Sequence, residues 1–474
     1  MLENSFFKHF LKIGMGTFVS MFLGLITTPI ITRIVSPDIY GKLSIFNMYV
    51  GIFVMILCLG LDQSLVRYFY VEDNLDYKRE LLFKCIVFPI LITEILSIIF
   101  FCLRINHMIK FEFSNQITIL LCMQTLLQLI YRFSLLIVRL EYNSNLYSAL
   151  TILSKILYVG LVLILLYNHK MDYFNCLVWA TVLSTALCLF VSIIKQRSIW
   201  CLHKIRIPMI KMKFAELINY GWPFIISMGI TQLFQALDKI SLNKYCSYTD
   251  VGVYSSAMTL VNIFAIVQTS FNSLWGPMAI EHYETKREDT SFYKDANQYI
   301  TIIMFFLGFS LIFVKDIFAF LLGTSYRDAA YILPFLIFNP IMYTISETTV
   351  QGIVFMKKTK MNIVIGAISC LVNYVGNSLL VPALGCKGAA ISTGISYIVF
   401  GVLRTCISNH YFYIDFSLGR FAIITLVAIL FAGYNTFFKF NYFTIILYIV
   451  SIIILIVLYK KYIKKGFIYL RRVF

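Results

Sequence analysis

Charged residues are scarce in this chain. Only 13% of its 474 residues are Asp, Glu, Lys or Arg, whereas 60% are hydrophobic, and the mean hydropathy is +0.82. A soluble domain carries roughly 25% charged residues, so this sequence cannot cover a water-facing surface of its size. The scarcity excludes a soluble enzyme, a disordered protein and a secreted disulfide scaffold. It leaves an all-α integral membrane protein that crosses the bilayer many times.

Sequence motifs for catalysis or metal binding are also absent. The eleven cysteines occur singly, without a CxxC pair, and are interpreted as small core residues. No P-loop, G-x-S-x-G or H-E-x-x-H motif occurs, and the six histidines fall in loops or at the ends of apolar runs. No basic run is interleaved with aromatic residues as in a nucleic-acid groove. We therefore expect no enzyme activity, no metal, no cofactor and no nucleic-acid partner.

Apolar runs long enough to cross a bilayer recur along the whole chain. A transmembrane helix needs roughly 20 such residues, and the sequence contains fourteen candidates. The first run is long enough to be a retained helix rather than a cleaved signal peptide. The connections are too short for a folded extramembrane domain. The predicted spans are 11–32, 43–66, 83–103, 115–137, 148–168, 173–194, 214–237, 251–277, 298–320, 328–355, 361–381, 386–406, 419–437 and 441–459.

The distribution of basic residues orients these spans. With a cytoplasmic N-terminus, 28 of the 40 Lys and Arg residues fall on the cytoplasmic side and 11 on the opposite side. Membrane proteins accumulate Lys and Arg in cytoplasmic loops, which also accounts for the net charge of +17. We expect both termini to be cytoplasmic and the number of spans to be even, although twelve spans remain an alternative to fourteen.

A pattern near the start of the chain recurs halfway along. Gly41 pairs with Gly252 in this match, at an offset of 211 residues. Six predicted spans separate the two copies, and an even number preserves orientation. The halves are therefore expected to be parallel repeats, related by an axis along the membrane normal. The matching segments are IGMGTFVSMFLG at 13–24 with YGWPFIISMGIT at 220–231, and SPDIYGKLSIF at 36–46 with SYTDVGVYSSA at 247–257.

The repeat predicts three parts of the chain. Residues 1–213 would form an N-terminal six-helix bundle, and residues 214–418 would form a second one. Residues 419–474 would add two helices and a basic cytoplasmic tail. Transporters with a central site between two bundles have this layout.

Three candidate carboxylates lie inside predicted spans, and a fourth, Asp238, directly follows the span 214–237. An ionisable side chain at the centre of a bilayer costs at least about 2.5 kcal/mol, so it usually faces a cavity or a partner. These residues are candidates for coupling to protons or sodium, and the alternative is a buried structural hydrogen bond. The candidates are Asp62, Glu94, Asp238 and Glu347.

Basic and amide side chains form polar stripes on the predicted helices. Gln124, Gln128 and Arg132 recur at intervals of four residues, which places them on one helix face. One such stripe can simply hold two helices together, and a basic side chain can extend to the membrane–water interface. Polar faces on several helices, however, indicate a hydrated cavity. Its basic members suit an anionic head group such as a pyrophosphate. The predicted substrate-binding residues are Arg67, Arg132, Lys155, Lys239, Gln124, Gln128, Gln232 and Gln235.

The first 70 residues resemble one family of membrane proteins. The features are the glycines of the opening helix, Gly14 and Gly16, the loop RIVSPDIYG at 33–41, LGLD at 59–62, and Arg67 with Tyr68. This pattern is similar to the polysaccharide-flippase family (Wzx type), whose superfamily also holds lipid II flippases and MATE drug exporters. Within this motif lie two of the candidate site residues, Asp62 and Arg67.

The resemblance implies two six-helix bundles around a cavity that opens alternately to the two faces of the membrane. The implied cargo is an oligosaccharide repeat unit on undecaprenyl pyrophosphate, moved to the outer leaflet of a bacterial inner membrane by proton- or sodium-coupled antiport. The product would be O-antigen, capsule or another surface glycan. Partners would be the lipid-linked glycan, membrane lipid, and possible polymerase and chain-length regulator proteins. Two alternatives remain, a MATE-like drug exporter and a polysaccharide polymerase.

Overall fold

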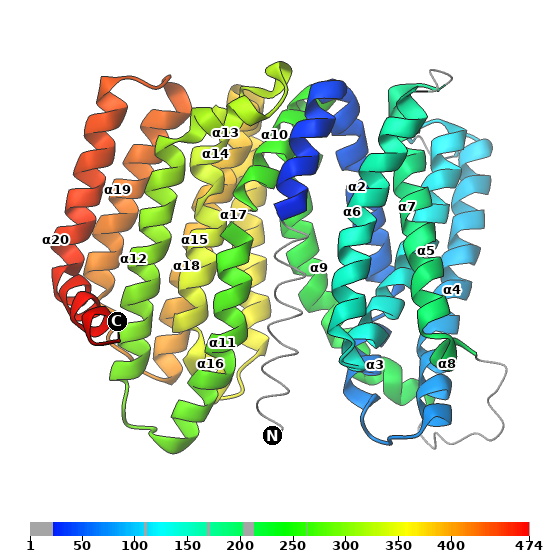
Figure 1. Cartoon of the computed structure of the whole chain (residues 1–474), viewed down its shortest axis with the longest axis horizontal. Coiled ribbons are helices and arrows are strands. Elements are labelled where there is room, and N and C mark those ends of the chain that lie inside the picture. Colours follow the sequence, from blue (N-terminus) through cyan, green and yellow to red (C-terminus); the bar gives the residue numbers. More distant parts are fainter. Residues whose placement is uncertain (1–21, 109–110, 168–170, 202–212, 263, 474) are drawn as a thin grey trace. The chain divides into compact units, whose positions relative to one another are not determined.

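The computed structural model describes residues 22–108, 111–167, 171–201, 213–262 and 264–473. Within these residues all regular structure is helical and no β-strand occurs (Figure 1). This confirms the predicted all-α fold. The start of the first predicted span, with Gly14 and Gly16, lies outside the described residues.

Eleven of the described helices are long and apolar enough to cross a membrane. They coincide with eleven of the fourteen predicted spans, so the chain is a multi-pass membrane protein. The count of fourteen stays a prediction. The other three predicted spans, 11–32, 214–237 and 251–277, coincide with the short apolar helix Phe22–Ile34, with the less apolar α9 (Phe214–Tyr245), and with the shorter helices α10 (Tyr248–Val261) and α11 (Phe264–Thr285).

The chain folds into two compact units. The first unit comprises residues 1–27 and 42–233, and the second comprises residues 28–41 and 234–474. One division therefore falls inside α9, twenty residues after the predicted boundary at 213. The assignment of bundles to 1–213, 214–418 and 419–474 stays a prediction.

The first unit is built from long helices that lie side by side (Figure 1). Helix α5 packs against α4, α6 and α7. The Asn74 side chain accepts a hydrogen bond from the amide of Asp76 at the start of α4, and Ser114 does the same for Ile117 in α5. The helices are α2 (Pro37–Leu57, from residue 42), α3 (Leu61–Tyr68), α4 (Leu75–Ile105), α5 (Asn115–Leu140), α6 (Ser144–Tyr167), α7 (Tyr173–Lys195), α8 (Arg197–Trp200) and the first part of α9.

A glycine contact fixes the short helix α3 against α9 within the first unit. Gly60 precedes α3 and has φ +68°, a conformation that side chains disfavour. A Cβ on Gly60 would lie 2.0 Å from the carbonyl oxygen of Gly221 in α9. The Ser64 hydroxyl donates to the carbonyl of Leu217, at 2.6 Å. This close packing sets the position of Asp62, in the first turn of α3.

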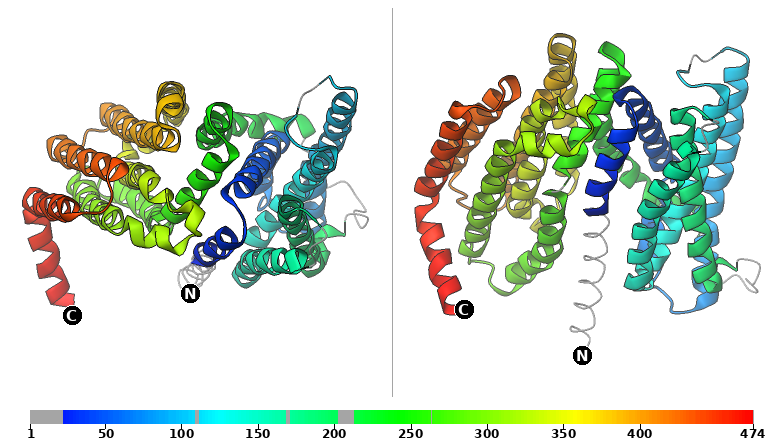
Figure 2. Two further views of the ribbon diagram at one scale, coloured as in Figure 1. Left: turned by 90° about the horizontal axis from the view of Figure 1, so that it is seen from above. Right: turned by 45° about the horizontal axis from the view of Figure 1, so that its top comes forward.

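The second unit contains the remaining helices, of which α17 and α18 lie side by side in every view (Figure 2). A single residue, Gly385 with φ +55°, separates these two helices, because glycine tolerates the sharp reversal. From α10 onward, the elements of this unit are, in chain order, α10, α11, α12 (Ser291–Phe313), α13 (Lys315–Leu321), the 3₁₀ turn Thr324–Tyr326, α14 (Ala329–Leu336), α15 (Phe338–Thr349), α16 (Gln351–Phe355), α17 (Lys360–Leu384), α18 (Cys386–Tyr411), α19 (Leu418–Phe437) and α20 (Tyr442–Val473).

Candidate functional site

A pocket of about 560 Å³ lies inside the first unit. Its volume falls in the range of roughly 300–1,000 Å³ typical of small-molecule sites. Gly51 lies in its wall close to Gln232, and a Cβ on Gly51 would lie 2.8 Å from the side-chain nitrogen of Gln232, which would have to move. The lining combines apolar residues with two arginines and two glutamines: Gly51, Val54, Met55, Gln128, Arg132, Leu135, Leu136, Arg139, Tyr147, Met228, Thr231 and Gln232.

Arg132 is held in this pocket by Asp62. Its Nε and Nη2 atoms donate to Oδ2 of Asp62 at 3.0 and 2.6 Å, and Gln63 donates to the same oxygen at 3.1 Å. Asp62 is buried, whereas the Arg132 side chain is 36% exposed. The carboxylate therefore anchors the guanidinium from behind and leaves part of it open to the pocket.

Arg139 adds a second positive charge to the same pocket. It lies seven residues after Arg132, two turns further along α5, and is exposed. It has no ion-pair partner among the described residues. With Asp62 counted, the pocket carries a net charge of +1, which favours an anionic ligand.

The structure brings together three of the eight predicted substrate-binding residues. Arg132, Gln128 and Gln232 line the pocket. The other five lie elsewhere: Gln124 is buried and donates to the Thr185 hydroxyl at 3.1 Å, Arg67 is exposed beside the Tyr68 ring, Lys155 is exposed on α6, and Gln235 and Lys239 belong to the second unit.

Two pocket residues, Arg139 and Tyr147, were not among the predicted site residues. Arg139 lies beyond the predicted span 115–137, but it belongs to α5, which continues to Leu140. The signal was available, because position 139 continues the stripe of Gln124, Gln128 and Arg132 by two helical turns. Nothing in the sequence pattern indicates Tyr147, which reaches the pocket from the neighbouring helix α6.

Asp238 is the centre of a buried polar network in the second unit. Its carboxylate accepts four hydrogen bonds, and none of the donors carries a charge. They come from α17, α18 and α10. The donors are Asn377 (2.9 Å), Asn373 (3.1 Å), the Thr393 hydroxyl (2.7 Å) and the Tyr254 hydroxyl (2.5 Å).

No cationic side chain among the described residues lies within 4 Å of this carboxylate. The side-chain oxygen of Asn377 is also buried there without a hydrogen-bond partner. A buried charge held only by neutral dipoles is unfavourable unless a proton or a cation joins it. The network therefore combines a carboxylate, two hydroxyl groups and the unpaired side-chain oxygen of Asn377, which are oxygen atoms of the kind that hard cations prefer.

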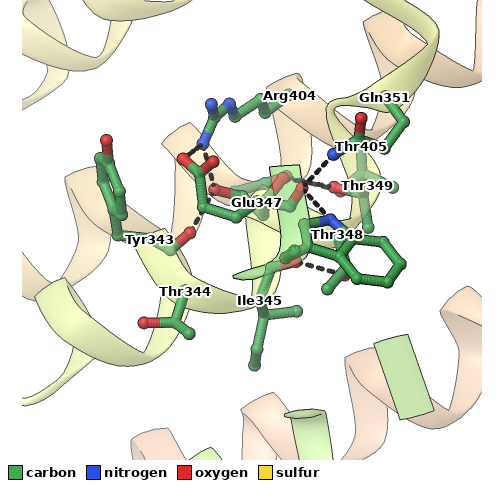
Figure 3. Close-up of polar contacts among 12 residues, drawn as sticks. Tyr343, Thr344, Ile345, Glu347, Thr348, Thr349, Gln351, Arg404 and Thr405 are labelled. Atoms are coloured by element: carbon green, nitrogen blue, oxygen red, sulfur yellow. Dashed lines mark hydrogen bonds and ion pairs between the residues drawn. The ribbon is translucent and has the colours of Figure 1, made fainter. Parts of the chain in front are cut away.

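Glu347 pairs with an arginine in a second buried site of the same unit (Figure 3). Nη1 of Arg404, on α18, donates to Oε1 of Glu347 at 2.7 Å and to the Ser346 hydroxyl at 2.9 Å. The guanidinium also lies over the rings of Tyr343 and Phe400, at 5.6 and 5.4 Å. Arg404 was expected at the cytoplasmic end of a span, so its role as partner of Glu347 was missed.

The four predicted ion-coupling carboxylates thus have three kinds of environment. Asp62 is paired with Arg132, and Glu347 is paired with Arg404. Glu94 is exposed on α4 and has no ion-pair partner among the described residues. Asp238 alone of the four is buried with no cationic side chain of the described residues within 4 Å of it. In the part of the chain that the structure describes, no group of three or more His, Cys, Asp or Glu residues could hold a metal ion.

A comparison with known families shows to which family the chain belongs. The family described as "Polysaccharide biosynthesis protein" matches residues 6–280, which is more than half of the chain. The chain belongs to this family. The match confirms, at the level of the family, the resemblance carried by the first 70 residues.

Two curated relatives of this polysaccharide biosynthesis protein come from archaea. One, of Haloferax volcanii, is named probable low-salt glycan biosynthesis flippase Agl15 and is 22% identical over 248 residues. That match covers 51% of this chain and 52% of the relative, so the chain spans about half of its length. The other is an uncharacterized membrane protein of Methanocaldococcus jannaschii, 22% identical over 416 residues, with 82% of this chain and 80% of that protein covered.

Two solved structures share the fold of this polysaccharide biosynthesis protein. Lipid II flippase MurJ, in an inward closed conformation, matches with a TM-score of 0.69 and 16% identity, over 97% of this chain and 99% of that one. A multidrug resistance MATE family transporter of the MOP superfamily, in an inward-facing conformation, matches with a TM-score of 0.54 and 14% identity, over 82% of this chain and 94% of that one. At these identities the similarity shows the fold.

Proposed function

We propose that this protein is a flippase that moves lipid-linked oligosaccharides across the membrane. The single observation that carries the proposal is the pocket with Arg132 and Arg139, enclosed by apolar helices of a polysaccharide biosynthesis protein. A fixed guanidinium suits the phosphates that link a glycan to its lipid. The similarity to a protein named as a glycan biosynthesis flippase supports the same function.

The detailed cargo is an oligosaccharide repeat unit on undecaprenyl pyrophosphate, for O-antigen or another surface polysaccharide. The protein would lie in a bacterial inner membrane with cytoplasmic termini, as the excess of basic residues on one side predicts. The pocket is large enough for the anionic head group. The lipid tail stays among the apolar helices, and alternating access carries the head group to the outer leaflet.

Asp238 is the best-supported site for coupling to a proton or sodium gradient. It is buried, it forms no ion pair within the described part of the chain, and four neutral donors from three helices surround it. Binding of a cation neutralises Asp238 and stabilises this network, and release of the cation weakens it. Glu94 serves as the control, because it is a carboxylate in the same membrane without buried contacts.

A strain without this protein tests the function directly. We expect lipid-linked single repeat units to accumulate on the cytoplasmic face, with no surface polymer. Repeat units that reach the outer leaflet unpolymerised would indicate a polymerase instead, and unchanged glycan with altered drug sensitivity would indicate a drug exporter.

Variants in that strain test which basic residues bind the head group. Arg139→Gln removes a pocket charge without breaking an ion pair, so we expect reduced surface glycan at normal protein levels. The pair Arg67→Ala with Lys155→Ala tests the residues favoured by sequence alone. Loss of glycan only in the second variant would overturn the pocket as the binding site.

Reconstituted vesicles test the coupling. Asp238→Asn keeps the size of the side chain but removes the charge and replaces one of the two acceptor oxygens by an NH2 group. We expect flipping by this variant to lose its response to an imposed proton or sodium gradient, whereas Glu94→Gln keeps it. An unchanged gradient response in Asp238→Asn would contradict the proposal.

A further inference from the structure

Residues 460–465 of α20 include four lysines on one exposed side of the helix. Lys460 and Lys464 are four residues apart, as are Lys461 and Lys465, so successive turns place them above one another. All four residues are exposed. On the other side of the helix, Tyr459 and Tyr462 are buried.

Aromatic contacts fix this part of α20 to the second unit. The helix bends at Tyr459, whose φ of −112° and ψ of 15° depart from helical values. The part of α20 after this bend runs in a different direction from the part before it (Figures 1 and 2). The guanidinium of Arg420 lies 5.7 Å from the Tyr459 ring and 5.5 Å from the Tyr462 ring. The buried side is therefore anchored, and the lysine side points outward.

The charge of this segment is largely uncompensated. Residues 459–474 contain six Lys or Arg and no Asp or Glu. Lys465 forms an ion pair with Asp295 of α12, at 2.5 Å. Lys460, Lys461 and Lys464 have no ion-pair partner among the described residues, and we refer to these three as the lysine face.

The lysine face lies where a transmembrane helix leaves the bilayer. Residues 442–458 of α20 contain no charged residue. With a rise of about 1.5 Å per residue, Lys460 to Lys464 lie within roughly 10 Å of the last apolar turn. That distance is comparable to the Debye length of about 8–10 Å at physiological salt. Lipid head groups at this depth are therefore not screened from the lysines.

We propose that the lysine face is a binding site for the head groups of anionic phospholipids on that side of the membrane. Three fixed positive charges match a row of phosphates, whereas zwitterionic lipids offer no net charge to them. The aromatic anchor holds the face at the depth of the head groups before lipid binds, so little conformational entropy is lost. The site does not depend on the transport function.

Lipid retention by the full-length protein tests the proposal. Phosphatidylglycerol is titrated against purified protein, with phosphatidylcholine as the neutral reference, and bound lipids are counted by native mass spectrometry. Each lysine near a membrane surface contributes about fivefold in affinity for anionic lipid. We therefore expect the triple variant K460Q/K461Q/K464Q to bind phosphatidylglycerol up to about a hundredfold more weakly. Phosphatidylcholine binding should not change.

A matched control distinguishes the effect of the lysine face on lipid affinity from a general effect of net charge. The variant K357Q/K358Q/K360Q removes two exposed lysines between α16 and α17 and a third at the first residue of α17. We expect it to keep most of its affinity for phosphatidylglycerol, and K460R/K461R/K464R to keep it as well. Equal losses in the two Gln variants, or unchanged affinity in K460Q/K461Q/K464Q, would overturn the proposal. Size-exclusion profiles establish that each variant is folded.

Discussion

Gly41 and Gly252 lie against each other across the starts of α2 and α10. A Cβ on Gly41 would be 1.8 Å from the carbonyl oxygen of Tyr248, and a Cβ on Gly252 would be 2.0 Å from the carbonyl oxygen of Pro37. An offset of 211 residues relates both Gly41 to Gly252 and Pro37 to Tyr248. The contact is therefore the same from either side. The internal repeat stays a prediction.

This contact predicts a strong effect of adding one methyl group. Gly41→Ala or Gly252→Ala would force two helix backbones apart, so we expect a loss of about 3 kcal/mol or more in the free energy of unfolding. Thermal unfolding in detergent measures it. Gly160→Ala is the control, because nothing lies within 4 Å of a Cβ there. An equal effect of all three substitutions would contradict the close approach.

The pair of Asp62 and Arg132 predicts non-additive stability. Arg132→Gln leaves a buried carboxylate without its partner, and we expect it to cost about 2 kcal/mol. That is less than the roughly 3–5 kcal/mol of a fully buried pair, since Arg132 is partly exposed. Asp62→Asn combined with Arg132→Gln should recover part of the loss. Chemical or thermal unfolding of the two single variants and the double variant gives the coupling energy. A coupling near zero would show that the ion pair is not formed.

The pair of Glu347 and Arg404 predicts a different order of stabilities. Both side chains are mostly buried, so Glu347→Gln strands a guanidinium among apolar helices and should cost about 3 kcal/mol. Replacing both residues, by Glu347→Leu and Arg404→Met, removes both charges and should be less harmful than the single change. The melting temperatures of the single and the double variant show which of them is more stable. A double variant that is less stable than Glu347→Gln would contradict this account.

The capping box at the start of α10 predicts a moderate effect. The Ser247 side chain accepts from the amide of Asp250, and the Asp250 carboxylate accepts from the amide of Ser247. Ser247→Ala should cost about 1 kcal/mol. Ser378→Ala is the matched control, because its hydroxyl donates only within its own helix, to the carbonyl of Tyr374. We expect no more than about 0.5 kcal/mol for that exposed change. Equal shifts in melting temperature would contradict the cap.

The helices were largely predictable, because a bilayer requires long apolar segments that satisfy their own hydrogen bonds. The breaks inside these helical segments were not predictable from the sequence. The predicted span 328–355 consists of α14, α15 and α16, and 251–277 consists of α10 and α11. Such breaks depend on how neighbouring helices replace the lost backbone hydrogen bonds, which composition does not record.

The candidate site was predictable only in part. The stripe on α5 was evident, since residues four apart share a helix face. Which polar faces share one pocket was not evident: Gln128 and Arg132 line it, whereas Gln124 on the same stripe is buried against Thr185. The partner of each carboxylate could not be predicted from the sequence either. Arg404 is 57 residues from Glu347, and Asn377 is 139 residues from Asp238.

The sequence by itself determined the class of this protein, most of its helices and the carboxylates that lie within or beside its membrane spans. These follow from hydropathy, periodicity and the high free energy of a lone charge in lipid. Only the tertiary structure decided which carboxylates are neutralised by arginine and which, at Asp238, is surrounded by neutral donors alone. The reason is physical: compensation of a charge depends on distances of a few ångströms between helices that are far apart in sequence.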